Sequence, residues 1–106
     1  VVFAGHSAGG HLAMWAARRR AIDPRHLLAR TDALQPGGVV SIAGIGDLDA
    51  FDREIGQFCG ADVLARLSPP AERAATSPTA MPASRVPHVM ISGTLDRLVP
   101  PWLGYE

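Results

Sequence analysis

The stretch that decides the fold is Val1-Val2-Phe3-Ala4-Gly5-His6-Ser7-Ala8-Gly9-Gly10-His11. A continuous apolar run leads into Gly-His-Ser-Ala-Gly, and residues 11–17 are apolar on nearly every side. The first run predicts a strand of a parallel sheet covered on both faces, and the second predicts a helix buried over most of its surface. A G-x-S-x-G sequence between a strand and a helix is typical of a turn that presents a serine as a nucleophile.

This turn, which we call the elbow, has a specific geometry. The chain must reverse between the strand end and the first helical turn, so we expect Ser7 to adopt a strained backbone conformation. A Cβ atom two residues before or after Ser7 would crowd the turn, which explains Gly5 and Gly9, and Gly10 relieves the packing of the helix on the strand. The helix N-terminus places the N–H of Ala8 where it can stabilise an oxyanion.

A glycine-rich turn between a strand and a helix can also bind a phosphate or have no catalytic role. Here the glycines lack the G-x-G-x-x-G spacing of dinucleotide-binding turns, and no Lys follows to complete a Walker A loop. No acidic residue closes a second strand about 20 residues beyond the turn either. The spacing therefore favours a nucleophile over a nucleotide-binding turn.

The composition excludes several other classes of function. The 106 residues are 47% hydrophobic, which is enough for the core of one domain or part of one. Ten basic and ten acidic residues balance, so no charge excess favours a nucleic acid or a membrane surface as partner. The single cysteine, Cys59, is expected to be a buried thiol, and no metal or cofactor site is predicted around it.

Two later apolar runs, 38–43 and 87–93, predict a second and a third strand. Residues 48–82 between them are mixed in polarity and rich in proline, and we expect short helices near 49–57 and 61–67 in a cap beside the site. Strand, helix, strand, excursion, strand is the order of an α/β domain with a parallel sheet and right-handed crossovers.

The helix ends carry their own predictions. Arg18, Arg19 and Arg20 are expected to lie in solvent, where cations complement the negative end of the first helix. Tyr105 and Glu106 are expected to begin another helix. No signal peptide and no apolar stretch of about 20 residues is visible, so we expect a cytoplasmic protein without a membrane partner, and its oligomeric state stays open.

Three segments, Gly5–Leu12, Ala43–Leu48 and Ser92–Pro100, together resemble the α/β-hydrolase superfamily. They are most similar to its serine esterase and kynurenine-formamidase-like branch. The resemblance spans nearly the whole chain but only the fifth to seventh strands of that fold. It implies that residues 1–106 form a partial domain, which lacks the N-terminal strands and the C-terminal histidine segment.

The resemblance implies a serine hydrolase that cleaves carboxylic esters or small amides through an acyl-enzyme on Ser7. Asp96, in the loop after the third strand, holds the position of the triad acid, which orients a histidine and stabilises its imidazolium form. Asp47 is a rival acid, although its place suits a cap. A kynurenine-formamidase-type amidohydrolase and a non-catalytic binding module of the same fold are the alternatives.

None of the four histidines suits the role of general base. His6 shares the elbow with the serine, and His11 is expected to be a satisfied core residue. His26 lies in a connection, and His88 opens the third strand, about 15 Å from the edge where the serine lies. The resemblance places the catalytic histidine and a second oxyanion donor outside these residues, so the fragment alone is expected to be nearly inactive.

Overall fold

Three apolar segments form a parallel sheet in the computed structural model, which describes residues 1–60 and 62–104. Strand β1 (Val2–His6) pairs with β2 (Gly38–Ile42), and β2 pairs with β3 (His88–Ile91), so the spatial order is the chain order. His6 lies beside Ile42 and Ile42 beside Ile91, so the three strands end at one level. The predicted α/β class with a parallel sheet is confirmed.

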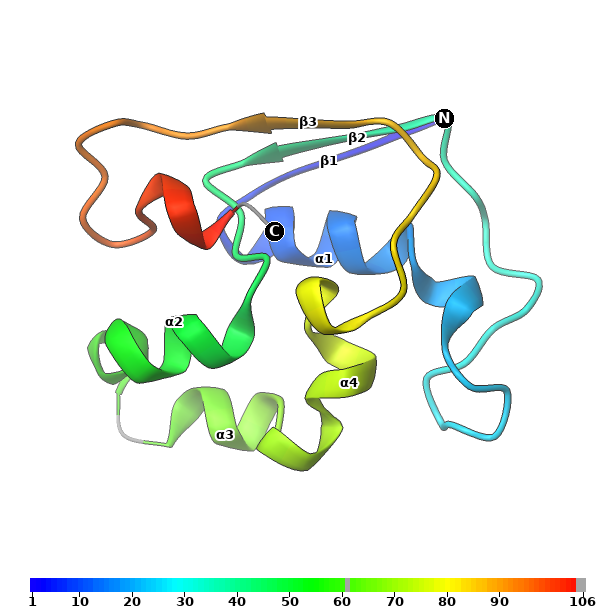
Figure 1. Cartoon of the computed structure of the whole chain (residues 1–106), viewed down its shortest axis with the longest axis horizontal. Helices are drawn as coiled ribbons and strands as arrows, with labels where there is room; N and C mark the ends of the chain where they lie inside the picture. The colour runs from blue at the N-terminus through cyan, green and yellow to red at the C-terminus, as the bar shows by residue number, and fades with distance from the viewer. Residues whose placement is uncertain (61, 105–106) are drawn as a thin grey trace.

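Helix α1 (Ala8–Ala16) packs along one face of this sheet (Figure 1). Alternate strand residues point toward it, and Val39 at the centre of β2 is only 1% exposed. This cluster is completed by Ala13 and Met14 of α1 and by Ala17, the residue after the helix. One side of α1 and one side of the sheet therefore form the first core.

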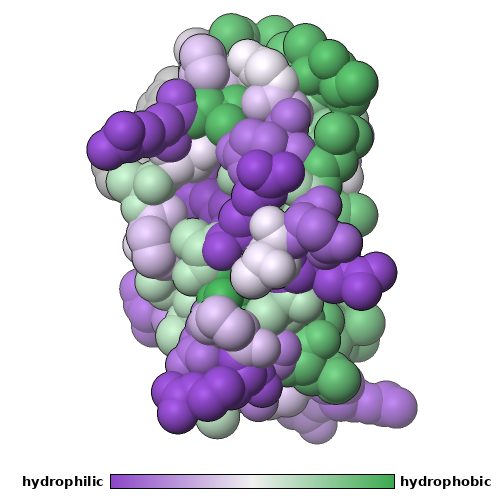
Figure 2. All heavy atoms as spheres, turned by 90° about the vertical axis from the view of Figure 1, so that its right-hand side faces the viewer, coloured by the Kyte–Doolittle hydropathy of each residue, from purple (hydrophilic) through white to green (hydrophobic). Residues whose placement is uncertain are grey.

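The opposite face of the sheet is open, which corrects the prediction of a strand covered on both faces. Val2, Ile42, Val89 and Ile91 point away from α1 and are between 41% and 60% exposed. The helices of the described residues all lie on the other side (Figure 1), and Figure 2 shows hydrophobic surface gathered along the top, where the sheet lies. The outer edge of β1 has no partner strand among residues 1–60 and 62–104.

The segment between β2 and β3 forms a third layer on the far side of α1 (Figure 1). It contains α2 (Leu48–Glu54), α3 (Val63–Leu67) and α4 (Arg73–Thr76), joined by short 3-10 turns. The two predicted helices are confirmed in place but are shorter than expected, and Ala61, where the second was to begin, lies outside the described residues. A second core of buried residues holds this layer, formed by Ala43, Ile45, Leu48, Ala50, Phe51, Val99 and Leu103.

A buried arginine ties the third layer together. Arg73 is 3% exposed and donates hydrogen bonds to the carbonyl oxygens of Ser68, at 3.0 Å, and Leu48, at 3.4 Å. Its guanidinium also forms ion pairs with Asp49 at 2.6 Å and Asp52 at 3.2 Å. Because a guanidinium offers five donors in a fixed fork, one side chain can join α2 to the chain that follows α3.

Three further predictions have different outcomes. Arg18 is buried at 6% exposure, which corrects the expectation that all three arginines lie in solvent. Cys59 is exposed and not buried as expected, because the 3-10 turn that carries it, Gly56–Cys59, lies at the surface. The helix predicted from Tyr105 falls outside the described residues. None of the helices in the described ranges is long and apolar enough to cross a bilayer.

We predict that Arg73→Met lowers the free energy of unfolding by about 3 kcal/mol, because it leaves two backbone carbonyls without their donor. Urea titration measures the change. The matched control is Arg66→Met, since Arg66 is an exposed residue of α3 and its loss is expected to cost less than about 0.5 kcal/mol. Equal effects of the two substitutions would contradict a structural role for Arg73.

Candidate active site

Ser7 links the end of β1 to the start of α1 in a conformation that side chains rarely adopt. Its φ is 56° and its ψ is −118°, outside the allowed regions for a residue with a Cβ atom. The N–H of Ser7 donates to the carbonyl of Ile42 at 2.9 Å, and its carbonyl accepts from the N–H of His11 at 3.1 Å. The predicted backbone strain is confirmed, and these bonds hold it from both sides.

The glycines around Ser7 have unequal roles. A Cβ atom at Gly5 would lie 2.0 Å from the Gly9 carbonyl oxygen, and one at Gly10 would lie 2.7 Å from the Cα of Gly44. A Cβ atom at Gly9 would meet nothing within 4 Å, which corrects the prediction that both elbow glycines prevent crowding. Gly9 lies exposed in the first turn of α1, so only Gly5 and Gly10 are required by close contacts.

Ala8 is the first residue of α1 and is exposed. An N–H in the first turn of a helix has no carbonyl acceptor within that helix, and it lies at the positive end of the helix dipole. The N–H of Ala8 is therefore available, by its position, to a negatively charged oxygen beside Ser7.

Asp96 lies in the loop after β3 and is half-buried. Its Oδ1 accepts from the backbone N–H groups of Leu98 and Val99, both at 2.9 Å, so the carboxylate shapes its own turn. Within residues 1–60 and 62–104, Oδ2 accepts no hydrogen bond, and it can still receive one. The turn also anchors the loop, since the Val99 side chain is buried in the second core.

The parallel register brings Ser7 and Asp96 to the same edge of the sheet. Both follow the carboxyl ends of strands that flank β2, so the strand ends are separated by two inter-strand spacings, about 10 Å. The rival acid, Asp47, is the N-cap of α2, where its Oδ1 accepts from the N–H of Ala50 at 3.0 Å. Capping explains Asp47 without a catalytic role.

Three of the four histidines form hydrogen bonds away from the elbow: His11, His26 and His88. His11 donates from Nε2 to the Thr76 carbonyl at 2.8 Å, as expected of a satisfied residue, and His26 pairs through Nε2 with Glu72 at 2.7 Å. Burial lowers the pKa of His11 below its ordinary value of 6.5, and the bond to Thr76 offsets only part of this. His6 is exposed and adjoins the serine in sequence.

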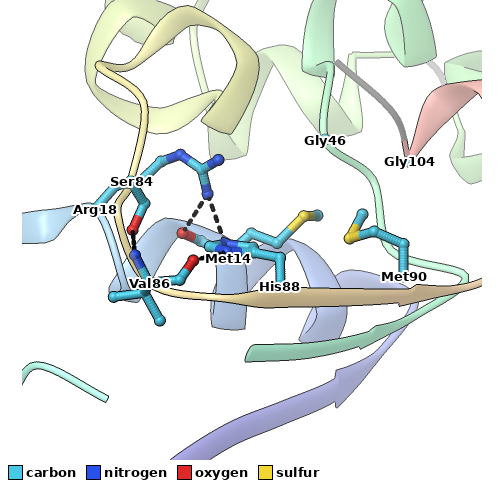
Figure 3. A pocket seen from close by; sticks show the side chains of 8 residues that line it. All are labelled: Met14, Arg18, Gly46, Ser84, Val86, His88, Met90 and Gly104. Atoms are coloured by element: carbon cyan, nitrogen blue, oxygen red, sulfur yellow. Dashed lines mark hydrogen bonds between the residues drawn. The ribbon is translucent and has the colours of Figure 1, made fainter. Parts of the chain in front are cut away.

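His88 lines a cavity of about 320 Å³ that lies away from the elbow (Figure 3). Its Nδ1 donates to the Val86 carbonyl at 2.6 Å, so Nε2 accepts from Nη1 of Arg18 at 3.0 Å. Figure 3 shows Arg18 extending over His88 to make this bond. Neither Ser7 nor Asp96 lines that cavity. The bond between Arg18 and His88 joins the segment after α1 to β3.

A different cavity adjoins the elbow, and sequence reasoning did not find it. It measures about 350 Å³ and is lined by Ala8 together with other residues of α1 and of the third layer. The sequence did contain one signal, because residues 8, 11, 12 and 15 recur at helical spacing on one side of α1. A cavity beside the nucleophile can hold part of a substrate.

Comparisons with protein-family models, with curated proteins and with solved structures found no match to this chain. In the described part of the chain, no group of three or more His, Cys, Asp or Glu side chains is arranged to hold a metal ion. The structure brings Ser7, the N–H of Ala8 and the loop of Asp96 to one edge of the sheet. Among residues 1–60 and 62–104, no histidine side chain forms a hydrogen bond with Ser7 or Asp96.

We predict that Gly5→Ala lowers the free energy of unfolding by about 3 kcal/mol, because the added methyl group meets backbone atoms that cannot move aside. Gly9→Ala is the matched control. It adds the same group to open space in a helix and is expected to leave stability unchanged or to raise it by up to about 1 kcal/mol. Urea titration measures the free energy of unfolding of the two variants. A larger loss of stability for Gly9→Ala than for Gly5→Ala would contradict the geometry of the elbow.

The lowered pKa of His11 predicts a pH dependence of stability. Below about pH 6.5 the unfolded chain binds a proton that folded His11 resists, so the free energy of unfolding falls as the pH falls. His11→Gln keeps a donor for Thr76 and removes this contribution. Urea midpoints at about pH 7.5 and about pH 5 should therefore differ less in His11→Gln than in the wild type, while the exposed-site control His6→Gln keeps the full difference.

Proposed function

We propose that this chain forms part of a serine hydrolase of the α/β-hydrolase type, which cleaves carboxylic esters or small amides. The observation that carries the proposal is the strained conformation of Ser7 at the junction of β1 and α1. A purely structural turn at this place could relieve the strain with glycine. Strain retained by a serine at the carboxyl edge of a parallel sheet is typical of a nucleophile.

The reaction begins when Oγ of Ser7 attacks the carbonyl carbon of the substrate and transfers its proton to a general base. The carbonyl oxygen gains negative charge, which the N–H of Ala8 stabilises. Collapse of the tetrahedral intermediate breaks the bond to the alcohol or amine, which leaves with the proton from the base. Water then attacks the acyl-enzyme by the same route in reverse and releases the acid.

The general base in this proposal is an imidazole that bridges Ser7 and Asp96. A gap of about 10 Å between the strand ends accommodates one ring between two side chains. The free Oδ2 of Asp96 would accept from Nδ1–H and hold the tautomer that takes the serine proton. The four histidines described above do not occupy this place, so the proposal assigns the base to a histidine outside the present residues.

An amidohydrolase of the kynurenine-formamidase type would use the same acyl-enzyme on Ser7. The two reactions differ in the leaving group, an alcohol or an amine, and the positions of Ser7, Ala8 and Asp96 serve both. A non-catalytic binding module is the remaining alternative, and it does not explain why Ser7 keeps a strained backbone conformation.

The test is reaction of the full-length encoded protein with a fluorophosphonate, followed by peptide mass spectrometry. The proposal predicts a covalent adduct on Ser7 and no labelling of the Ser7→Ala variant, because only an activated serine attacks the probe. A folded protein that stays unlabelled would contradict the proposal and favour the binding module.

The same reaction separates the two acids. Asp96→Asn is expected to slow labelling of Ser7 by about 10³-fold or more, because an amide cannot hold the required tautomer. Asp47→Asn is the matched control, since asparagine also caps a helix well, and it should leave the rate nearly unchanged. The reverse ranking would move the acid to Asp47.

A further inference from the structure

The helix after the elbow has a second apolar side, which faces the cavity of about 350 Å³ described above. On this side Ala8, His11, Leu12 and Trp15 follow one another at helical spacing, whereas Ala13 and Met14 face the sheet. The facing wall comes from the third layer (Figure 1) and is formed by Ile45, Leu48, Leu64, Leu67, Ser68 and Thr76, with Leu28 from the connection before β2. The cavity thus extends from the residue next to Ser7 along a largely apolar hollow that is open to solvent at Leu12 and Leu67.

Four polar side-chain groups in this wall, away from the N–H of Ala8, are already bonded to the protein itself. The ring N–H of Trp15 donates to the Ala75 carbonyl, and Nε2 of His11 donates to the Thr76 carbonyl, both at 2.8 Å. The hydroxyls of Ser68 and Thr76 lie 2.7 Å apart and form a hydrogen bond. A hydroxyl or a charge that entered would lose water without finding a partner in this part of the wall, which is unfavourable.

We infer that this cavity receives an uncharged alkyl or aryl group flanking the scissile carbonyl, so that the substrates are apolar esters or amides and not hydroxylated or charged ones. This inference rests on the proposed attack by Ser7. Most of the wall is apolar, so it offers many contacts to such a group and few to a polar one. Its volume, about 350 Å³, is near the lower end for small-molecule sites and suits a group as large as hexyl.

The experiment uses two alkylphosphonofluoridate probes, one whose alkyl group is methyl and one whose alkyl group is hexyl. It compares the rates at which they label Ser7 in the full-length encoded protein. Each methylene that leaves water contributes a factor of about 4. The hexyl probe is therefore expected to react at least about 50-fold faster than the methyl probe, since burial of about three of its five additional methylenes gives a factor of that size. A third probe whose hexyl chain ends in a carboxylate should lose most of that advantage.

Two variants at the rim of the cavity test its role. Leu12 and Leu67 line it and are 57% and 79% exposed, so substitutions there leave the core intact. Leu67→Asp adds a charge at the rim and Leu12→Trp fills space, and each should reduce the preference for hexyl over methyl about tenfold or more. Leu27→Asp is the matched control, because Leu27 is 96% exposed and does not line the cavity.

The outcomes separate this inference from the proposed function. Labelling of Ser7 at equal rates by both probes, or a hexyl preference unchanged in both rim variants, would overturn the inference and leave the hydrolase proposal standing. No labelling by either probe would overturn the hydrolase proposal and the inference with it. A hexyl preference lost in the rim variants and kept in Leu27→Asp would support both.

Discussion

The close contact of α1 with the ends of β1 and β2 is the constraint on which the rest of the structure depends. A Cβ atom at Gly5 would lie 2.0 Å from a helix carbonyl oxygen, and one at Gly10 would lie 2.7 Å from the Cα of Gly44. Bare backbone at these points lets the chain reverse within one residue, Ser7, whose φ is 56°. The sheet and the helix together maintain a conformation that an isolated peptide would abandon.

The parallel register extends this local constraint to the whole edge of the sheet. Because the three strands end at one level, the loop that carries Asp96 lies on the same edge as Ser7, with β2 between them. One oxygen of Asp96 accepts two hydrogen bonds within its own turn, which fixes the carboxylate, and the other oxygen accepts none from the described residues. The geometry at this edge therefore suits the proposed acyl transfer, and the largely apolar lining of the adjacent cavity suits the proposed apolar substrate.

Local patterns predicted much of this arrangement, and packing decided the remainder. Three apolar runs were enough to locate the strands, and the spacing around Ser7 was enough to predict its strain, because both are properties of the backbone. The open face of the sheet, the burial of Arg18 and the space at Gly9 depend on which elements lie opposite, and local sequence patterns do not show which elements those are. The cavity beside Ala8 escaped prediction for the same reason, since two distant segments form its walls.

The most direct test of the account is a crystal structure of the full-length encoded protein after reaction with a fluorophosphonate. The account predicts a phosphorus bonded to Oγ of Ser7, with a phosphonyl oxygen about 2.7–3.1 Å from the backbone nitrogen of Ala8. It also predicts a histidine ring between Ser7 and Oδ2 of Asp96. A phosphonate on any other residue, or a Ser7 with relaxed helical or extended dihedral angles and Asp96 at a different edge, would contradict it.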